Sequence, residues 1–140
     1  LSEQAHRTVD IFSYDLDAAI YDQETFVAAI KGLAIRSPRT RIRILLQDNN
    51  RVQKEGHRLV QLWRRLSSKI ELRRPHHDYI NHPENFFIAD NLGYMHLKTS
   101  ARHQGIANFN AKLKAGKLSD FFAEVWERSE TDSELRGLHL

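Results

Sequence analysis

The chain contains eight histidines, and histidine is a common metal ligand in proteins. His76 and His77 are adjacent, so their side chains point in different directions on any regular element. No His-Glu-x-x-His motif or comparable spacing occurs. Asp78 and His82 could join His76 in a loop site, but exposed histidines in a polar loop explain these residues more simply. We therefore predict no metal site and no cofactor.

Several reaction classes are excluded by what the sequence lacks. There is no cysteine, which rules out disulfides, zinc–thiolate sites and a cysteine nucleophile. The phosphate-binding loops G-x-G-x-x-G and G-x-x-x-x-G-K-[ST] do not occur, and neither does the G-x-S-x-G elbow of serine hydrolases. Dinucleotide-dependent enzymes, P-loop nucleotidases and this class of hydrolase are therefore not expected.

The most informative residues lie between positions 82 and 110. His82-Pro83 precedes an apolar segment at residues 86–89, and a turn and a second strand-like segment follow. Gly105-Ile106-Ala107-Asn108 comes next, before a terminal helix with the pattern Phe-Phe-x-x-Val-Trp. This order resembles one lobe of the phospholipase D superfamily, in which an H-x-K-x-x-x-x-D motif, a G-S-x-N-like segment and an aromatic-rich helix follow one another. Ile106 stands where that family has serine.

The resemblance implies a mechanism and a set of candidate residues. In the family, one histidine attacks phosphorus and forms a phosphohistidine, while a histidine of a second lobe or subunit protonates the leaving group. Lysine and asparagine side chains bind the phosphoryl oxygens. By this resemblance His82 and Asn108 are candidate catalytic residues, and a single lobe works as a homodimer.

The family's motif is degenerate in this sequence. Counting from His82, Glu84 stands at the lysine position and Ala89 at the aspartate position. A second alignment uses His96 and Lys98, which would share one face of a strand, but it also lacks the acidic residue. Because arginine is a good bidentate phosphate ligand, Arg73 or Arg74 is a candidate anion-binding residue in place of the missing lysine.

The hydrophobic pattern predicts an α/β fold with a mixed, mostly parallel sheet and helices on both faces. Early strand–helix alternation favours parallel pairing through right-handed crossovers, and a late hairpin adds antiparallel strands. We expect one phospholipase D-like domain at residues 1–128 and a weakly packed polar tail at residues 129–140. The expected strands are 8–14, 41–46, 70–72, 86–89 and 94–97, and the expected helices are 23–35, 51–66 and 118–126.

Positive charge is concentrated in the middle of the chain. The formal net charge is +3, but residues 36–74 hold twelve Lys and Arg against three Asp and Glu, a net of +9. Such a segment can attract phosphate, nucleic acid or an acidic protein. The basic residues of the helix expected at 51–66 do not share one face, and no aromatics interleave with them on the exposed side, which disfavours nucleic acid as the partner.

The resemblance narrows to a bacterial phospholipase D-like domain of unknown function that often follows an acetyltransferase domain of the GNAT class. The chain begins at Leu1 rather than Met, so we expect the C-terminal part of a larger protein. The acetyl-CoA loop Q/R-x-x-G-x-G/A is absent, so this segment is not expected to transfer acetyl groups. No apolar run approaches the ~20 residues of a membrane span, and no signal peptide is visible, so we expect a cytoplasmic protein without a membrane partner.

Two hypotheses of function remain. The first is a non-catalytic binding or interaction domain that takes an anionic ligand or a neighbouring domain of the same chain. The second is a phosphodiesterase or nuclease with a modified motif, active as a dimer.

Overall fold

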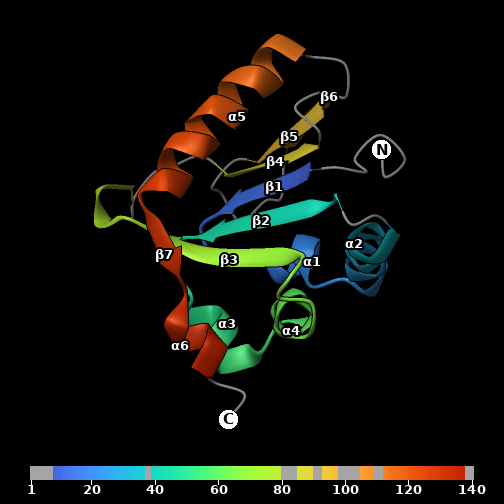
Figure 1. Cartoon of the computed structure of the whole chain (residues 1–140), viewed down its shortest axis with the longest axis vertical. Helices are drawn as coiled ribbons and strands as arrows, with labels where there is room; N and C mark the ends of the chain where they lie inside the picture. The colour runs from blue at the N-terminus through green and yellow to red at the C-terminus, as the bar shows by residue number, and fades with distance from the viewer. Residues whose placement is uncertain are drawn as a thin grey trace.

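One mixed sheet organises the domain, flanked by helices (Figure 1). The computed structural model describes residues 8–36, 39–79, 85–89, 93–97, 105–108 and 112–137. Within these residues seven strands lie in the order β6-β5-β4-β1-β2-β3-β7, which confirms the α/β class. The strands are β1 (Thr8–Ser13), β2 (Arg41–Leu46), β3 (Ile70–Pro75), β4 (Asn85–Ala89), β5 (Gly93–Leu97), β6 (Gly105–Asn108) and β7 (Ser129–Thr131). The helices are α1 (Ala18–Tyr21), α2 (Glu24–Arg36), α3 (Asn50–Glu55), α4 (Arg58–Arg65), α5 (Lys112–Glu127) and α6 (Ser133–Gly137), with a 3₁₀ turn η1 (His77–Tyr79).

The expectation of a mostly parallel sheet is wrong. Among the described strands only β1–β2 and β2–β3 pair in parallel, whereas β1–β4, β4–β5, β5–β6 and β3–β7 pair antiparallel. A parallel pair needs a long crossover, usually helical. Helices supply one between β1 and β2 and another between β2 and β3, so these two pairs can be parallel.

The larger hydrophobic core lies between one face of the sheet and the helices α1, α2, α3, α4 and α6. Alternate residues of the strands point to this face, as the two-residue period of a strand requires. Trp63 of α4 and Leu135 of α6 are both buried there. The sheet contributes Val9, Ile11, Ile42, Ile44, Leu46, Ile70, Leu72, Phe87 and Ala89.

On the opposite face of the sheet, the described residues place helix α5. Its buried residues Leu118, Phe122 and Trp126 pack on Phe12, Leu45, Phe86 and Ile88 of the strands. Helices therefore cover both faces, as the sequence predicts (Figure 1). This second core covers only part of the face, and charged side chains occupy the neighbouring part.

The single helix expected at residues 51–66 is two helices. Gly56 has φ 76° and ψ 167°, a conformation that only glycine adopts readily, and it ends α3. His57 then begins α4, because its side chain accepts a hydrogen bond from the backbone N–H of Leu59. The apolar stripe runs through both helices, so it does not reveal the break.

The expected polar tail after residue 128 is wrong for the residues described. Ser129–Thr131 forms β7, which pairs with β3 at the sheet edge. Asp132 and Leu135 are both buried. The edge strand and the single apolar residue of α6 are too short to give a periodic signal, which is why composition alone indicates a tail.

Helix α5 begins at Lys112, earlier than the expected helix at 118–126. The added turns carry exposed Lys114 and Lys117 around buried Ala115, so their apolar signal is weak. Within the described residues, no helix combines the length and apolar character needed to cross a membrane.

Candidate functional site

Two candidate residues of the degenerate motif lie on described strands, His96 on β5 and Asn108 on β6. His96 lies on β5, opposite Phe86 of β4 and Ile106 of β6. Asn108, the last residue of β6, pairs with Tyr94, so it is a diagonal neighbour of His96 at about 7–8 Å between their backbones. His82 and Lys98 lie outside the described residues. The register thus brings His96 and Asn108 to adjacent strands.

Arg73 and Arg74 cannot act together on one phosphate, because successive residues of a strand point to opposite faces of the sheet. Arg73 lies on the α5 face, where its guanidinium group is 4.2 Å from the centre of the Trp126 ring. It also donates to the Trp126 carbonyl at 3.3 Å and to Glu71 at 3.3 Å, while its Nε is buried without a partner. Arg74 is bound to Glu134 of α6. Both proposed clamp residues are therefore engaged by the protein itself.

Charged residues form a ladder on the α5 face of the sheet, beside the aromatic residues of α5. Asp10 of β1 stands directly opposite Arg43 of β2, and Arg43 stands opposite Glu71 of β3. Arg43 donates from Nε and a terminal nitrogen to the two oxygens of Asp10, at 2.9 and 3.0 Å. Glu71 also lies 3.7 Å from Arg41. The alternation of charges at Arg41, Arg43, Glu71 and Arg73 is visible in the sequence, but the partner Asp10 lies inside an apolar strand.

Asp10 is the most deeply placed carboxylate of this ladder, with 2% of its surface exposed. Burial raises its pKa above the ordinary value, and the hydrogen bonds and charge of Arg43 oppose that rise. The guanidinium of Arg43 lies 5.1 Å from the Phe122 ring and 5.5 Å from the Trp126 ring. This arrangement holds the sheet to α5, so we assign it a structural role.

The carboxyl ends of the parallel strands are where open α/β sheets usually bind ligands. Here β1 is followed by Asp15 and Asp17, and β2 by Asp48. Arg51 lies 3.3 Å from Asp15, and the Tyr14 hydroxyl donates to Asp48 at 3.1 Å. That hydrogen bond and the Asp48 charge raise the pKa of Tyr14. The described groups after β1 and β2 give this end a negative character.

After β3, the side chains of His76, His77 and Asp78 bring three possible metal ligands within 4.8 Å of one another. Arg128 already occupies this cluster, since its guanidinium lies 2.8 Å from Asp78 and 3.3 Å from Nδ1 of His76. Hydrogen bonding to Arg128 lowers the pKa of Asp78. A cation held against Asp78 and His76 opposes a metal ion there, so these residues do not form a prepared metal centre. His82, the third member of the loop site considered from sequence, lies outside the described residues.

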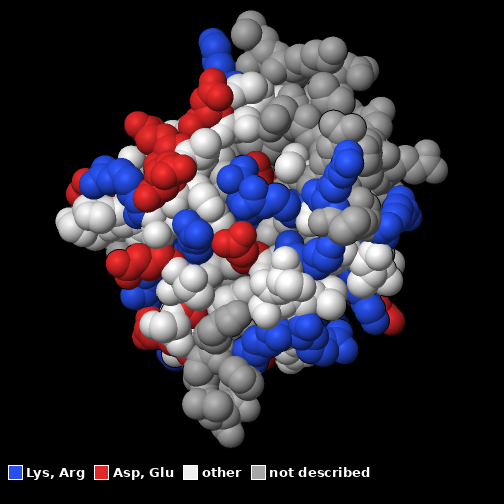
Figure 2. Space-filling view, in the orientation of Figure 1, with Lys and Arg blue, Asp and Glu red and all other residues white. Residues whose placement is uncertain are grey.

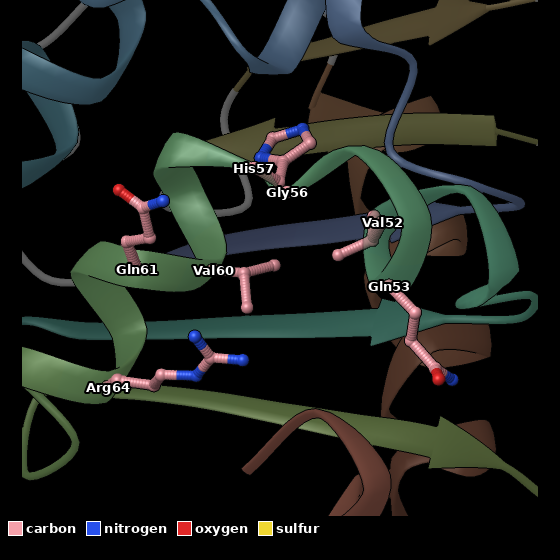
Figure 3. A pocket seen from close by; sticks show the side chains of 7 residues that line it. All are labelled: Val52, Gln53, Gly56, His57, Val60, Gln61 and Arg64. Carbon is pink, nitrogen blue, oxygen red and sulfur yellow. The ribbon is translucent and has the colours of Figure 1, made fainter. Parts of the chain in front are cut away.

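A cavity of about 210 Å³ lies between α3 and α4 (Figure 3). Val52, Val60 and Arg64 point into it, whereas Gln53 and Gln61 point away. Its lining also includes Gly56 and His57, and no sequence motif indicates it.

The one histidine of this cavity has both ring nitrogens occupied. His57 accepts from Leu59 N–H at Nδ1 and lies 3.0 Å from the Leu16 carbonyl at Nε2. Arg64 donates to the Leu135 carbonyl at 2.7 Å. These contacts join α4, α6 and the loop after β1, which makes His57 and Arg64 structural residues.

Basic residues gather at the amino ends of β2 and β3. Arg36 ends α2, Arg65 ends α4, and Arg41 begins β2. The Lys69 carbonyl accepts from Ile42 N–H, which ties the two strand starts together. We call Arg36, Arg39, Arg41, Arg65 and Lys69 the basic edge. Figure 2 shows Lys and Arg over this side of the molecule, and Asp and Glu gathered toward the opposite side, over α5.

Comparison with known proteins gives a family and a fold. The model of a family described as a domain of unknown function, DUF7931, matches residues 1–138. The chain belongs to this family. No curated protein matches it significantly. The match continues through β7 and α6, so this DUF7931 domain does not end at the boundary expected near residue 128.

Among solved structures, the fold of this chain resembles the structure of TrmBL2, which is described as an archaeal chromatin protein with a novel mode of DNA binding. The TM-score is 0.60 at 15% sequence identity, over 93% of this chain and 46% of that one. The domain therefore spans less than half of that neighbour. At this identity the likeness concerns the fold alone.

Proposed function

We propose that this domain is a non-catalytic, phospholipase D-like binding module that takes an anionic partner. The proposal includes its position in a larger protein beside a domain of the GNAT acetyltransferase class, as the sequence resemblance implies. The module would supply binding, and any acetyl transfer would belong to the other domain.

The proposal rests on the contacts that the Arg73 guanidinium makes within the protein. Glu84 and Ala89 replace the lysine and aspartate of the family's motif, and Arg73 was a candidate to restore the positive charge. Its guanidinium is instead stacked on Trp126 and bound to Glu71 and a backbone carbonyl. Releasing it toward a phosphate would break these contacts. Arg74 has its own carboxylate partner on the other face of the sheet.

Charge at the two ends of the sheet supports the same proposal. Asp15 and Asp48 follow the strands at the carboxyl end, where they repel a phosphodiester. The basic edge at the amino end attracts one. An anionic partner therefore binds away from the end at which catalytic sites of open α/β sheets usually form.

The partner of the basic edge has three candidate sources. The neighbouring domain of the same chain or a second copy could present acidic residues, and nucleic acid presents phosphates. DNA binding is described for TrmBL2, which shares the fold. For this chain the candidate rests on the basic edge and not on that likeness.

The test is hydrolysis of bis-p-nitrophenyl phosphate by wild type and His82→Ala, with light scattering on the same samples. We expect no difference in hydrolysis between them, because the motif lacks its cationic clamp. The control is Arg73→Gln, which removes the arginine that could replace the missing lysine in binding the phosphodiester.

Hydrolysis by a dimer that disappears in His82→Ala with the fold intact would overturn the proposal. It would support the alternative, a phosphodiesterase or nuclease with a modified motif. In that case loss of activity in Arg73→Gln would identify the replacement clamp.

A further inference from the structure

The basic edge is suited to phosphate groups by its composition and its shape. Four of its five residues are arginines, whose planar guanidinium groups bind phosphate oxygens in pairs. Arg41 and Lys69 lie at the starts of adjacent strands, which run about 4.7–4.9 Å apart. Arg36 and Arg65 continue the cations onto the ends of two helices, where the helix dipole favours positive charge. The result is a strip of cations and not a pocket for one small anion.

Within the described residues, an ion pair joins a carboxylate, that of Glu71, to the basic edge. Glu71 lies 3.7 Å from Arg41, and it also binds Arg73. The Arg41 side chain is nevertheless 63% exposed. Arg36 and Arg65 are also exposed, which adds to the positive charge of the edge.

The exposed apolar side chains near the basic edge indicate which kind of anionic partner it can bind. In the described residues, the large exposed hydrophobic side chains are Ile35 and Tyr14. Tyr14 follows β1 and so lies at the other end of the sheet. Ile35 is 65% exposed beside Arg36, and one side chain does not make the apolar centre typical of a protein–protein interface.

The same observation disfavours a lipid surface and a single-stranded nucleic acid. Membrane-surface binding needs an apolar face that enters the lipid, and single-strand binding uses exposed aromatics on which bases stack. The described part of the basic edge has neither. Contacts with the phosphates of a duplex need only cations at suitable spacing.

The charge distribution would orient such a complex. Asp120 and Glu124 are exposed on α5, and Asp15 follows β1, all away from the basic edge. A polyanion therefore attracts one side of the domain and repels the other. This polarity explains how a chain with a net charge of only +3 could bind one.

We propose that the basic edge binds the phosphate backbone of double-stranded nucleic acid without reading its sequence. This rests on the proposed function, because it names the anionic partner of the same module. Five phosphate contacts would give a slope of about −4.5 in log affinity against log salt concentration, at about −0.9 for each phosphate neutralised.

The test uses fluorescence anisotropy with short DNA duplexes of two unrelated sequences across a salt series. The variant Arg36→Gln/Arg39→Gln/Arg41→Gln removes three cations of the edge. We expect the salt slope to become shallower by about 2.7, three times the loss for one phosphate contact. Both duplexes should bind equally.

The matched control is Lys54→Gln/Lys114→Gln/Lys117→Gln, which removes the same charge from exposed positions on α3 and α5. We expect its salt slope to stay at the wild-type value. Circular dichroism and urea unfolding of both variants check that the fold is retained.

Several outcomes would overturn the inference. They are no duplex binding at low salt, an equal effect of the two triple variants, and tighter binding of single strands or of anionic vesicles. Failure here leaves the proposed function standing if hydrolysis is absent. Conversely, hydrolysis that depends on His82 would overturn the proposed function whatever the duplex result.

Discussion

Asp10 and Arg43 stand opposite each other on the parallel strands β1 and β2 and form a two-pronged ion pair. Asp10 is 2% exposed, and the Arg43 side chain is 20% exposed. Arg43 also contacts the rings of Phe122 and Trp126. One arginine thus neutralises a carboxylate within the sheet and supports the helix that covers it.

Arg43→Ala should destabilise the domain strongly. Removing one partner of a buried pair leaves the other charge uncompensated, at a cost of about 3–5 kcal/mol. The variant should lose more stability than Asp10→Ala, because the carboxylate is the more deeply buried group. Urea unfolding at neutral pH measures both, and a larger loss in Asp10→Ala would contradict the assignment.

The pH dependence of Arg43→Ala provides an independent check. Burial already raises the pKa of Asp10, and losing Arg43 should raise it further. A carboxyl with a raised folded-state pKa stabilises the fold below its unfolded pKa, and this is lost as pH rises through the folded pKa. The variant should therefore be relatively more stable in mild acid than at neutral pH, and the companion variant Asp10→Asn/Arg43→Ala should lack that difference.

His57 should make the fold sensitive to acid. Burial lowers its pKa below the ordinary value of 6.5. The neutral ring accepts from Leu59 at Nδ1 and can donate to the Leu16 carbonyl at Nε2, whereas protonation places a hydrogen against the Leu59 N–H. Its stabilising contribution is thus present above pH 6.5 and lost as pH falls through the folded pKa.

Replacing His57 by asparagine separates the cap from the titration. Asparagine is a good N-cap but does not ionise. His57→Asn should weaken the domain at neutral pH, because the contact with Leu16 is lost, and should reduce the fall in unfolding free energy between about pH 7.5 and pH 5.5. The control is His77→Asn, at a side chain that is 80% exposed. An unchanged pH dependence in His57→Asn would rule out this role.

Asp132 should hold the C-terminal segment on the domain. It accepts from Asn49 at 3.0 and 3.2 Å and from the N–H of Leu135 at 3.2 Å. Asp132→Ala removes the acceptor of the Leu135 N–H and leaves the Asn49 amide only its longer contact with Glu134, at 3.4 Å, so we expect a loss of about 1–3 kcal/mol in urea unfolding. Glu130→Ala, at an exposed position of β7, should have little effect. Equal, small effects of both variants would mean that this segment packs as loosely as its composition suggests.

The sequence predicted the elements that carry strong periodic patterns. The three parallel strands, α2 and the β4–β5 hairpin lie close to their expected positions, because a buried strand or an amphipathic helix must repeat its apolar residues. The helix break at Gly56 was not predicted, because Val52, Leu59 and Trp63 remain on one apolar stripe across it. The short strands β6 and β7 were not predicted, because three or four residues are too few to show a hydrophobic period.

The candidate site was predictable only as a set of residue types. The amino-acid sequence by itself determined the degenerate motif, with Glu84 and Ala89 at two of its positions, and the excess of positive charge in residues 36–74. It also indicated a sheet covered by helices on both faces. Only the tertiary structure decided that Arg73 binds Trp126 and Glu71, that Arg74 binds Glu134, and that the cations gather where β2 and β3 begin. The physical reason is that charges act through distance and burial, and these depend on which strands become neighbours.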